Sequence, residues 1–151
     1  MVRFAAWFWM GVVFGVSFIA TPVKFRALSL SMPVALDVGH VTLHALNRIE
    51  WFFAAVLLLV TVRYNRRQGS AAPSSVTTRR LVLLGTVSVC TVVLAQALWL
   101  LPALDLRTAE IIAGRPQPPS SLHGLFIGAE LLKLCLLWGV GLFATPIASQ
   151  R

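Results

Sequence analysis

The sequence predicts an all-α integral membrane protein, a single domain built as a bundle of four transmembrane helices. Hydrophobic residues make up 58% of its 151 residues and charged residues only 12%, whereas a soluble domain is about 45–50% apolar and about 25% charged. Four apolar runs approach or exceed the roughly 20 residues that a helix needs to cross a bilayer. Together these runs and their connections take up the chain, so we expect no separate soluble domain.

The first predicted span is the apolar run 4–21, which ends before Pro22. This run is longer than the apolar core of a signal peptide and is not followed by a small-x-small cleavage site, so we expect it to be retained. Gly11 and Gly15 form a small-xxx-small pair, a spacing that lets another helix approach closely.

The second predicted span covers residues 40–62 and lies within a longer helix. Ser31 precedes Met32 and Pro33, and a hydroxyl before a proline in the first turn is typical of a helix start. We therefore expect one helix from about Met32 to about Tyr64, with its first turns at or above the membrane surface.

The third predicted span covers 81–101 and is closed by Pro102, and the fourth covers 122–144. The connections are then two outer loops, 23–39 and 102–121, and one polar loop, 63–80, on the other side. In the fourth span three glycines are suited to close helix contact; they are Gly124, Gly128 and Gly139.

The distribution of basic residues predicts the orientation. Loop 63–80 holds five arginines and no acidic residue, and Arg3 and Arg151 fall on the same side, which gives that side seven of the thirteen basic residues. Basic loops stay in the cytoplasm, so we expect both termini to be cytoplasmic, in the inner membrane of a bacterium. This rule accounts for the net charge of +8. The expected partners are the lipid bilayer and a second copy of the chain in a homo-oligomer, not nucleic acid.

Polar side chains gather on one face of the second span. At about 100° per residue, most of them fall within roughly a quarter-turn and Glu50 lies at the edge. The fourth span carries His123 and Glu130 on one face, with Lys133 beside Glu130. Polar residues facing lipid are costly, so both faces are expected to line an outward-facing cavity between these two spans. Its predicted lining residues are Asp37, His40, His44, Asn47, Arg48, Glu50, His123, Glu130 and Lys133.

Depth along the two parallel spans predicts which charges meet. At about 1.5 Å per residue, Arg48 and Glu130 lie at similar depth, and Glu50 and Lys133 lie about one turn deeper. We therefore expect two ion pairs, Arg48–Glu130 and Glu50–Lys133. In the third span, Gln96 is expected to contact a neighbouring helix, with the cavity as the alternative.

The histidines offer metal-binding alternatives. His40 and His44 are four residues apart, so their rings share one helix face, and His123 opens the fourth span; these three are the candidate metal ligands. Haem ligation by His44 and His123 is a further alternative. The simplest interpretation is that these histidines lie at the membrane surface and form hydrogen bonds to water or to loops. We therefore expect no cofactor, and a bound transition metal or haem is the alternative.

Short motifs resemble a family of four-span bacterial membrane proteins built around a domain of unknown function. These motifs are Gly11, Gly15, Phe18, Thr21-Pro22 and Phe25 in the first part of the chain, and Ser121-Leu-His123-Gly124 at the start of the fourth span. The family is related to a eukaryotic transmembrane protein linked to platinum-drug resistance. The resemblance implies a four-helix membrane fold and an export-related role, and it implies no catalytic residue.

The sequence therefore predicts a small membrane protein that binds or transports a small solute or ion. A membrane-embedded metal or haem redox protein is one alternative, and a structural or accessory subunit is another. No hydrolase or nucleotide-binding motif is present, so a non-enzymatic role is favoured and no residue is assigned as catalytic.

Overall fold

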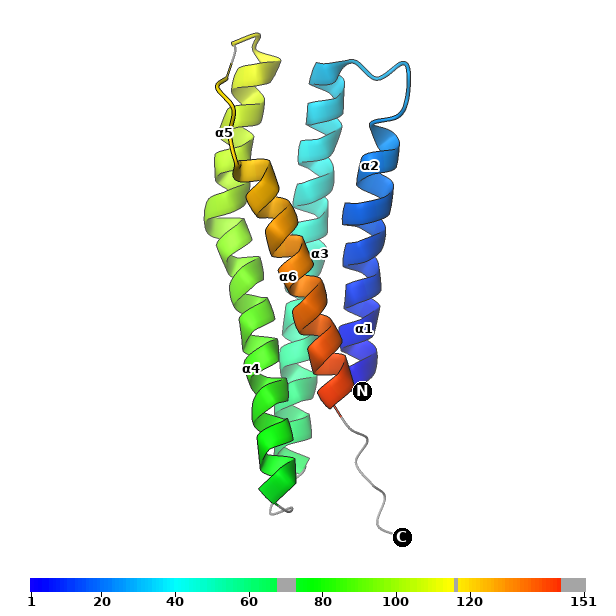
Figure 1. The fold of residues 1–151 in the computed structure, drawn as a ribbon, viewed down its shortest axis with the longest axis vertical. Helices are drawn as coiled ribbons and strands as arrows, with labels where there is room; N and C mark the ends of the chain where they lie inside the picture. The colour runs from blue at the N-terminus through cyan, green and yellow to red at the C-terminus, as the bar shows by residue number, and fades with distance from the viewer. Residues whose placement is uncertain (68–72, 116, 145–151) are drawn as a thin grey trace.

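The computed structural model of the protein describes residues 1–67, 73–115 and 117–144. Within these ranges the regular elements are all helices, which confirms the predicted all-α class (Figure 1). The elements are α1 (Val2–Val13), the π-helix η1 (Phe14–Ala20), α2 (Thr21–Lys24), α3 (Met32–Arg67), α4 (Pro73–Ala95), the π-helix η2 (Gln96–Leu100), α5 (Leu101–Ile112) and α6 (Leu122–Phe143).

These elements join into four long helices, as predicted. α1, η1 and α2 run on as one helix, and so do α4, η2 and α5; α3 and α6 are single helices. All four are long and apolar enough to cross a membrane. The helix predicted from about Met32 to about Tyr64 is confirmed as α3.

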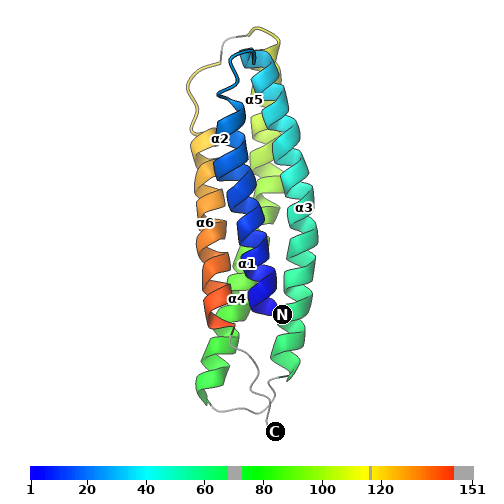
Figure 2. The same ribbon diagram turned by 90° about the vertical axis from the view of Figure 1, so that its right-hand side faces the viewer.

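The four helices alternate in direction and surround a shared axis. α1 packs against α3 and α6, and α4 packs against the same two helices from the other side. Figure 2 shows this arrangement, with α1 in front of α4 and with α6 and α3 on either side. The second and fourth spans are therefore diagonal in the bundle and do not pack side by side.

The two ends of the bundle differ in chemistry. One end, which we call the arginine end, carries Arg3, Arg63, Arg66, Arg67, Arg79 and Arg80. The opposite end, which we call the histidine end, carries His40 and His44 on α3 and Asp105 on α5. The chain begins at Met1 near the arginine end, and α6 also ends there (Figure 1).

Two prolines expected to end spans lie inside helices instead. Pro22 is the second residue of α2 and Pro102 is the second residue of α5, and a π-helix precedes each of them. Proline lacks an N–H and its ring clashes with a carbonyl of the preceding turn. A π-helical turn changes the hydrogen-bonding register, which lets the helix continue. Residues 102–112, placed in an outer loop from the sequence, are therefore helical.

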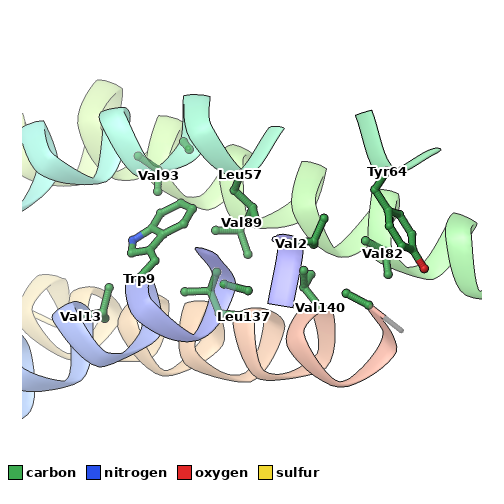
Figure 3. Packing of buried hydrophobic residues seen from close by; sticks show 13 residues of the cluster. Val2, Trp9, Val13, Leu57, Tyr64, Val82, Val89, Val93, Leu137 and Val140 are labelled. Carbon is green, nitrogen blue, oxygen red and sulfur yellow. The ribbon is translucent and has the colours of Figure 1, made fainter. Parts of the chain in front are cut away.

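The apolar core lies between the four helices in the half nearer the arginine end. Trp9 of α1 is fully buried at its centre, against Leu57 of α3, Val89 and Val93 of α4 and Leu137 of α6 (Figure 3). Because lipid tails are as apolar as these side chains, this core stabilises the bundle through van der Waals packing between the helices.

Close helix contact occurs at glycines other than those predicted. A Cβ atom at Gly141 would lie 2.0 Å from Nε1 of Trp7, and one at Gly85 would lie 2.6 Å from Cγ2 of Val140. The five glycines singled out from the sequence have open space at this position; they are Gly11, Gly15, Gly124, Gly128 and Gly139. Their faces stay open within one chain, and the homo-oligomer stays a prediction.

Candidate functional site

A buried ion-pair cluster lies at the centre of the bundle. Nζ of Lys133 on α6 is 2.5 Å from Oε1 of Glu50 on α3 and 2.7 Å from Oε1 of Glu130, one turn earlier on α6. The three side chains are at most 2% exposed. The predicted Glu50–Lys133 pair is confirmed, and it forms across the axis of the bundle between diagonal helices.

The other two spans donate hydrogen bonds to the same carboxylates. Nε1 of Trp9 donates to Glu50 over 3.3 Å, Oγ of Ser17 donates to Glu130 over 3.0 Å, and Nε2 of Gln96 donates to Glu130 over 2.9 Å. All four spans therefore contribute to one network, which we call the buried charge cluster. Its members are Trp9, Ser17, Glu50, Gln96, Glu130 and Lys133.

Both π-helices supply a donor to Glu130. Ser17 lies in η1 and Gln96 is the first residue of η2. An inserted π-turn rotates the residues that follow it relative to a regular α-helix and often occurs at functional sites. The two π-helices that precede Pro22 and Pro102 therefore also contain the polar side chains that point into the core, Ser17 and Gln96.

The cluster contains two carboxyl groups and one amine. It is neutral only if one carboxyl keeps a proton, and it carries one negative charge if all three groups are ionised. Oε1 of Gln96 is buried and accepts no hydrogen bond from the described part of the chain. Buried ion pairs stabilise a fold poorly compared with apolar packing, but removing one partner leaves an uncompensated charge. The cluster therefore connects all four spans at one level of the bundle.

The predicted Arg48–Glu130 pair is wrong. Arg48 is exposed, and the only cation paired with Glu130 among the described residues is Lys133. Residues 48 and 50 point roughly 160° apart on a helix. Because Glu50 faces the axis of the bundle, Arg48 has to face outward.

A second polar cluster forms at the histidine end. Nε2 of His40 lies 3.2 Å from Asp105 and Nε2 of His44 lies 2.9 Å from it. The two imidazole rings meet edge to face, with centroids 4.5 Å apart. The ligand atoms of the three residues all lie within 4.8 Å of one another. We call these three residues the histidine–aspartate cluster.

Two histidines and one carboxylate form a donor set that transition metals accept. Three protein ligands with open positions for water are typical of functional zinc sites and of non-haem iron sites. The three side chains are about a third exposed, so an ion can reach them. Nε2 of His44 lies within hydrogen-bonding distance of Asp105, and a ring nitrogen has to be free of its proton before it can bind a metal.

The remaining predicted site residues lie apart from both clusters. Asp37 and His123 are exposed, and neither makes a side-chain hydrogen bond or ion pair within the described part of the chain. His123 is not in the metal-competent group, where Asp105 takes the place expected for it. Asn47 is buried between the clusters, and its Oδ1 accepts a hydrogen bond from Nε1 of Trp51 over 3.2 Å.

The outward-facing cavity expected between the second and fourth spans is closed at its floor. Glu50, Glu130 and Lys133 are sealed from solvent by α1 and by η2, whose side chains bond to them. The polar residues of the second span therefore separate into a sealed inner group and an accessible outer group.

Four site residues were not predicted as members: Trp9, Ser17, Gln96 and Asp105. Trp9 and Ser17 lie in an apolar run without any charge, and Gln96 was expected to contact a neighbouring helix, with the cavity as the alternative. Asp105 follows Pro102, where a loop was expected. The available signal was its position: α5 continues the third span, and an acidic residue one turn beyond a span end is expected near residues at the outer end of the second span.

Comparison with known proteins gives a family and no function. Neither the curated proteins nor the solved structures contain a match to this chain. The profile of a family described as a domain of unknown function, DUF4149, matches residues 4–109, which cover α1 to most of α5 and include the histidine–aspartate cluster and Glu50. Because this match spans more than half of the sequence, the chain belongs to the DUF4149 family.

Proposed function

We propose that this protein is a membrane metal-binding protein that holds a divalent transition-metal ion at His40, His44 and Asp105. The observation that carries the proposal is the grouping of three ligand atoms within 4.8 Å from two separate helices. His40 and His44 come from successive turns of α3, and Asp105 comes from α5, which packs beside it.

The buried charge cluster has a structural role in this proposal. Glu50 is six residues beyond His44, or about 9 Å along α3. Fixing the register of α3 against the third span at that level also fixes the approach of Asp105 to the two histidines. The sealed interior supports binding at the accessible end in preference to passage of an ion along the axis.

The proposal includes an orientation. Five of the six basic residues at the arginine end are on or beside the second and third spans, and basic loops stay in the cytoplasm. The histidine end then faces away from the cytoplasm, in the inner membrane of a bacterium, and captures its ion from outside.

Metal binding is tested by titrating the detergent-purified protein with Zn²⁺ in a calorimeter and with Co²⁺ in a spectrophotometer. We expect one ion per chain and Co²⁺ absorption bands typical of histidine and carboxylate ligation. Mutation of residues that only support a ligand already costs about 10–100-fold in affinity, so His44→Gln and Asp105→Asn should each lose at least that factor.

The matched controls are His123→Gln and Asp37→Asn, which remove the same side-chain types from exposed positions. Both should bind Zn²⁺ within twofold of the wild type. The proposal fails if the wild type binds no metal, or if His123→Gln weakens binding as much as His44→Gln. A structural or accessory role would then be the better assignment.

A further inference from the structure

A separate pocket lies at the arginine end, the end of the bundle opposite to the histidine–aspartate cluster. It has a volume of about 740 Å³ and lies between the start of α1 and the last turns of α3. Phe4 and Trp7 of α1 form one wall, and Val60 and Tyr64 of α3 form the other. Pockets that hold small molecules typically have volumes of about 300–1,000 Å³.

Three arginines line this pocket, namely Arg3, Arg63 and Arg67. None of the five acidic residues of the chain lines it: two belong to the buried charge cluster and the other three lie toward the histidine end. Among the described residues, no carboxylate therefore compensates the positive charge at the pocket, and an anionic ligand would complement it.

Arg3 is held in place by α6. Its Nε donates to the carbonyl oxygen of Gly141 over 2.9 Å, and the guanidinium lies 5.3 Å from the centre of the Trp7 ring. Trp7 in turn stacks on Trp138 of α6. This wall of the pocket is therefore ordered by packing, and Arg63 and Arg67 face it from an exposed position on α3.

The surface beside the pocket is apolar and exposed. Phe4 is 74% exposed and Phe8, one turn further along α1, is 53% exposed. Such side chains belong in contact with acyl chains on a helix that crosses a membrane. A ligand in this pocket can therefore place an apolar part along α1 while a charged part meets the arginines.

We propose that this pocket binds an anionic phospholipid. The headgroup phosphate contacts Arg63 and Arg67, and the first part of an acyl chain lies against Phe4 and Trp7. Guanidinium groups bind phosphate oxygens through paired, charge-assisted hydrogen bonds. Three cations with no acidic side chain beside them favour a headgroup of net negative charge over a zwitterionic one. This site is independent of the metal-binding proposal.

Native mass spectrometry of the detergent-purified protein tests the site. The probes are phosphatidylglycerol and phosphatidylcholine with identical palmitoyl and oleoyl chains, and inorganic phosphate alone. We expect one phosphatidylglycerol per chain to be retained. Phosphatidylcholine should bind at least about tenfold more weakly, because its choline places a positive charge near three arginines. Free phosphate should also bind at least about tenfold more weakly, because it has no acyl chain to lie against Phe4 and Trp7.

The double variant Arg63→Gln/Arg67→Gln should bind phosphatidylglycerol with an affinity at least about tenfold lower than that of the wild type. Its matched control is Arg66→Gln/Arg80→Gln, which removes two exposed arginines from the same end that do not line the pocket. The control should retain the lipid within twofold. As a second readout, phosphatidylglycerol should raise the thermal unfolding midpoint of the wild type and of the control, and not that of the pocket variant.

Several results would overturn the proposal. Equal loss in both double variants would show general attraction of lipid to a basic surface. Equal retention of phosphatidylcholine would show that the site does not distinguish headgroups by their charge. Tight binding of inorganic phosphate would remove the role of the acyl chain. A lipid-free dimer that dissociates in the pocket variant would show a second copy of the chain in this position.

Discussion

Glu50 and Lys133 meet 2.5 Å apart on the axis of the bundle, although their helices, α3 and α6, are diagonal and do not pack side by side. Lys133 is completely buried, and its long side chain crosses the space that a smaller residue would leave open. The ion pair therefore links α3 and α6 directly. The apolar packing joins each of these helices only to its neighbours, α1 and α4.

Replacing Lys133 with methionine should destabilise the bundle strongly. Methionine fills a similar volume but leaves Glu50 and Glu130 without a cation, and removing one partner of a buried ion pair costs about 3–5 kcal/mol. Thermal unfolding of the detergent-purified variant, followed by circular dichroism, should show a clearly lower midpoint.

The same change in a neutral background separates charge from shape. If the loss arises from unpaired carboxylates, Lys133→Met in a protein that already carries Glu50→Gln and Glu130→Gln should cost less than about 1 kcal/mol. An equal loss in both backgrounds would mean that the lysine acts by its shape and not by its charge.

Trp9 should contribute both packing and a hydrogen bond to the same cluster. Trp9→Phe keeps an aromatic ring in the core but removes the N–H that donates to Glu50, and hydrogen bonds to charged groups contribute about 1.5–3 kcal/mol. Trp99→Phe is the control, because Trp99 is 60% exposed and its replacement should change the unfolding free energy by less than about 0.5 kcal/mol. Similar losses in the two variants would contradict a role for this hydrogen bond.

Much of the fold was predictable because the bilayer imposes length and composition on each helix. The start of α3 was predicted from Ser31 and Pro33, and the Glu50–Lys133 pair from depth along two parallel spans. Depth, however, gives no information about direction around the axis. The helical projection of the second span placed Arg48 on the same face as His40 and His44. In the structure this face is rotated by roughly a third of a turn from the buried face that contains Glu50.

The partners of the charged residues were harder to predict for two reasons. Trp9 and Ser17 look apolar or small in a hydrophobic run, and only the bundle geometry shows that they point at carboxylates. Asp105 belongs to a helix that the sequence ends at Pro102, because a proline usually stops a helix. The π-helix before Pro102 was not predicted, so Asp105 was placed in a loop and its position just beyond the third span was not used.

Arg48 should be dispensable for the stability of the bundle. It is exposed and makes no ion pair with Glu130, so Arg48→Leu should change the unfolding free energy by no more than about 0.5 kcal/mol. Its comparison with Lys133→Met under the same conditions tests the assignment of the Glu130 partner. A loss for Arg48→Leu as large as that for Lys133→Met would restore the pairing first inferred from depth.

Gly141 should tolerate a larger side chain poorly, because the Trp7 side chain of α1 packs directly against it. An added Cβ would lie 2.0 Å from Nε1 of Trp7, so Gly141→Ala should cost about 1–3 kcal/mol through overpacking. Gly139→Ala is the matched control on the same helix: its Cβ meets nothing within 4 Å, and alanine favours a helix over glycine by up to about 1 kcal/mol. The two variants should therefore shift the unfolding midpoint in opposite directions. Adding Trp7→Ala should remove most of the penalty at Gly141 in a double-mutant cycle, and a penalty that persists without Trp7 would place its cause elsewhere.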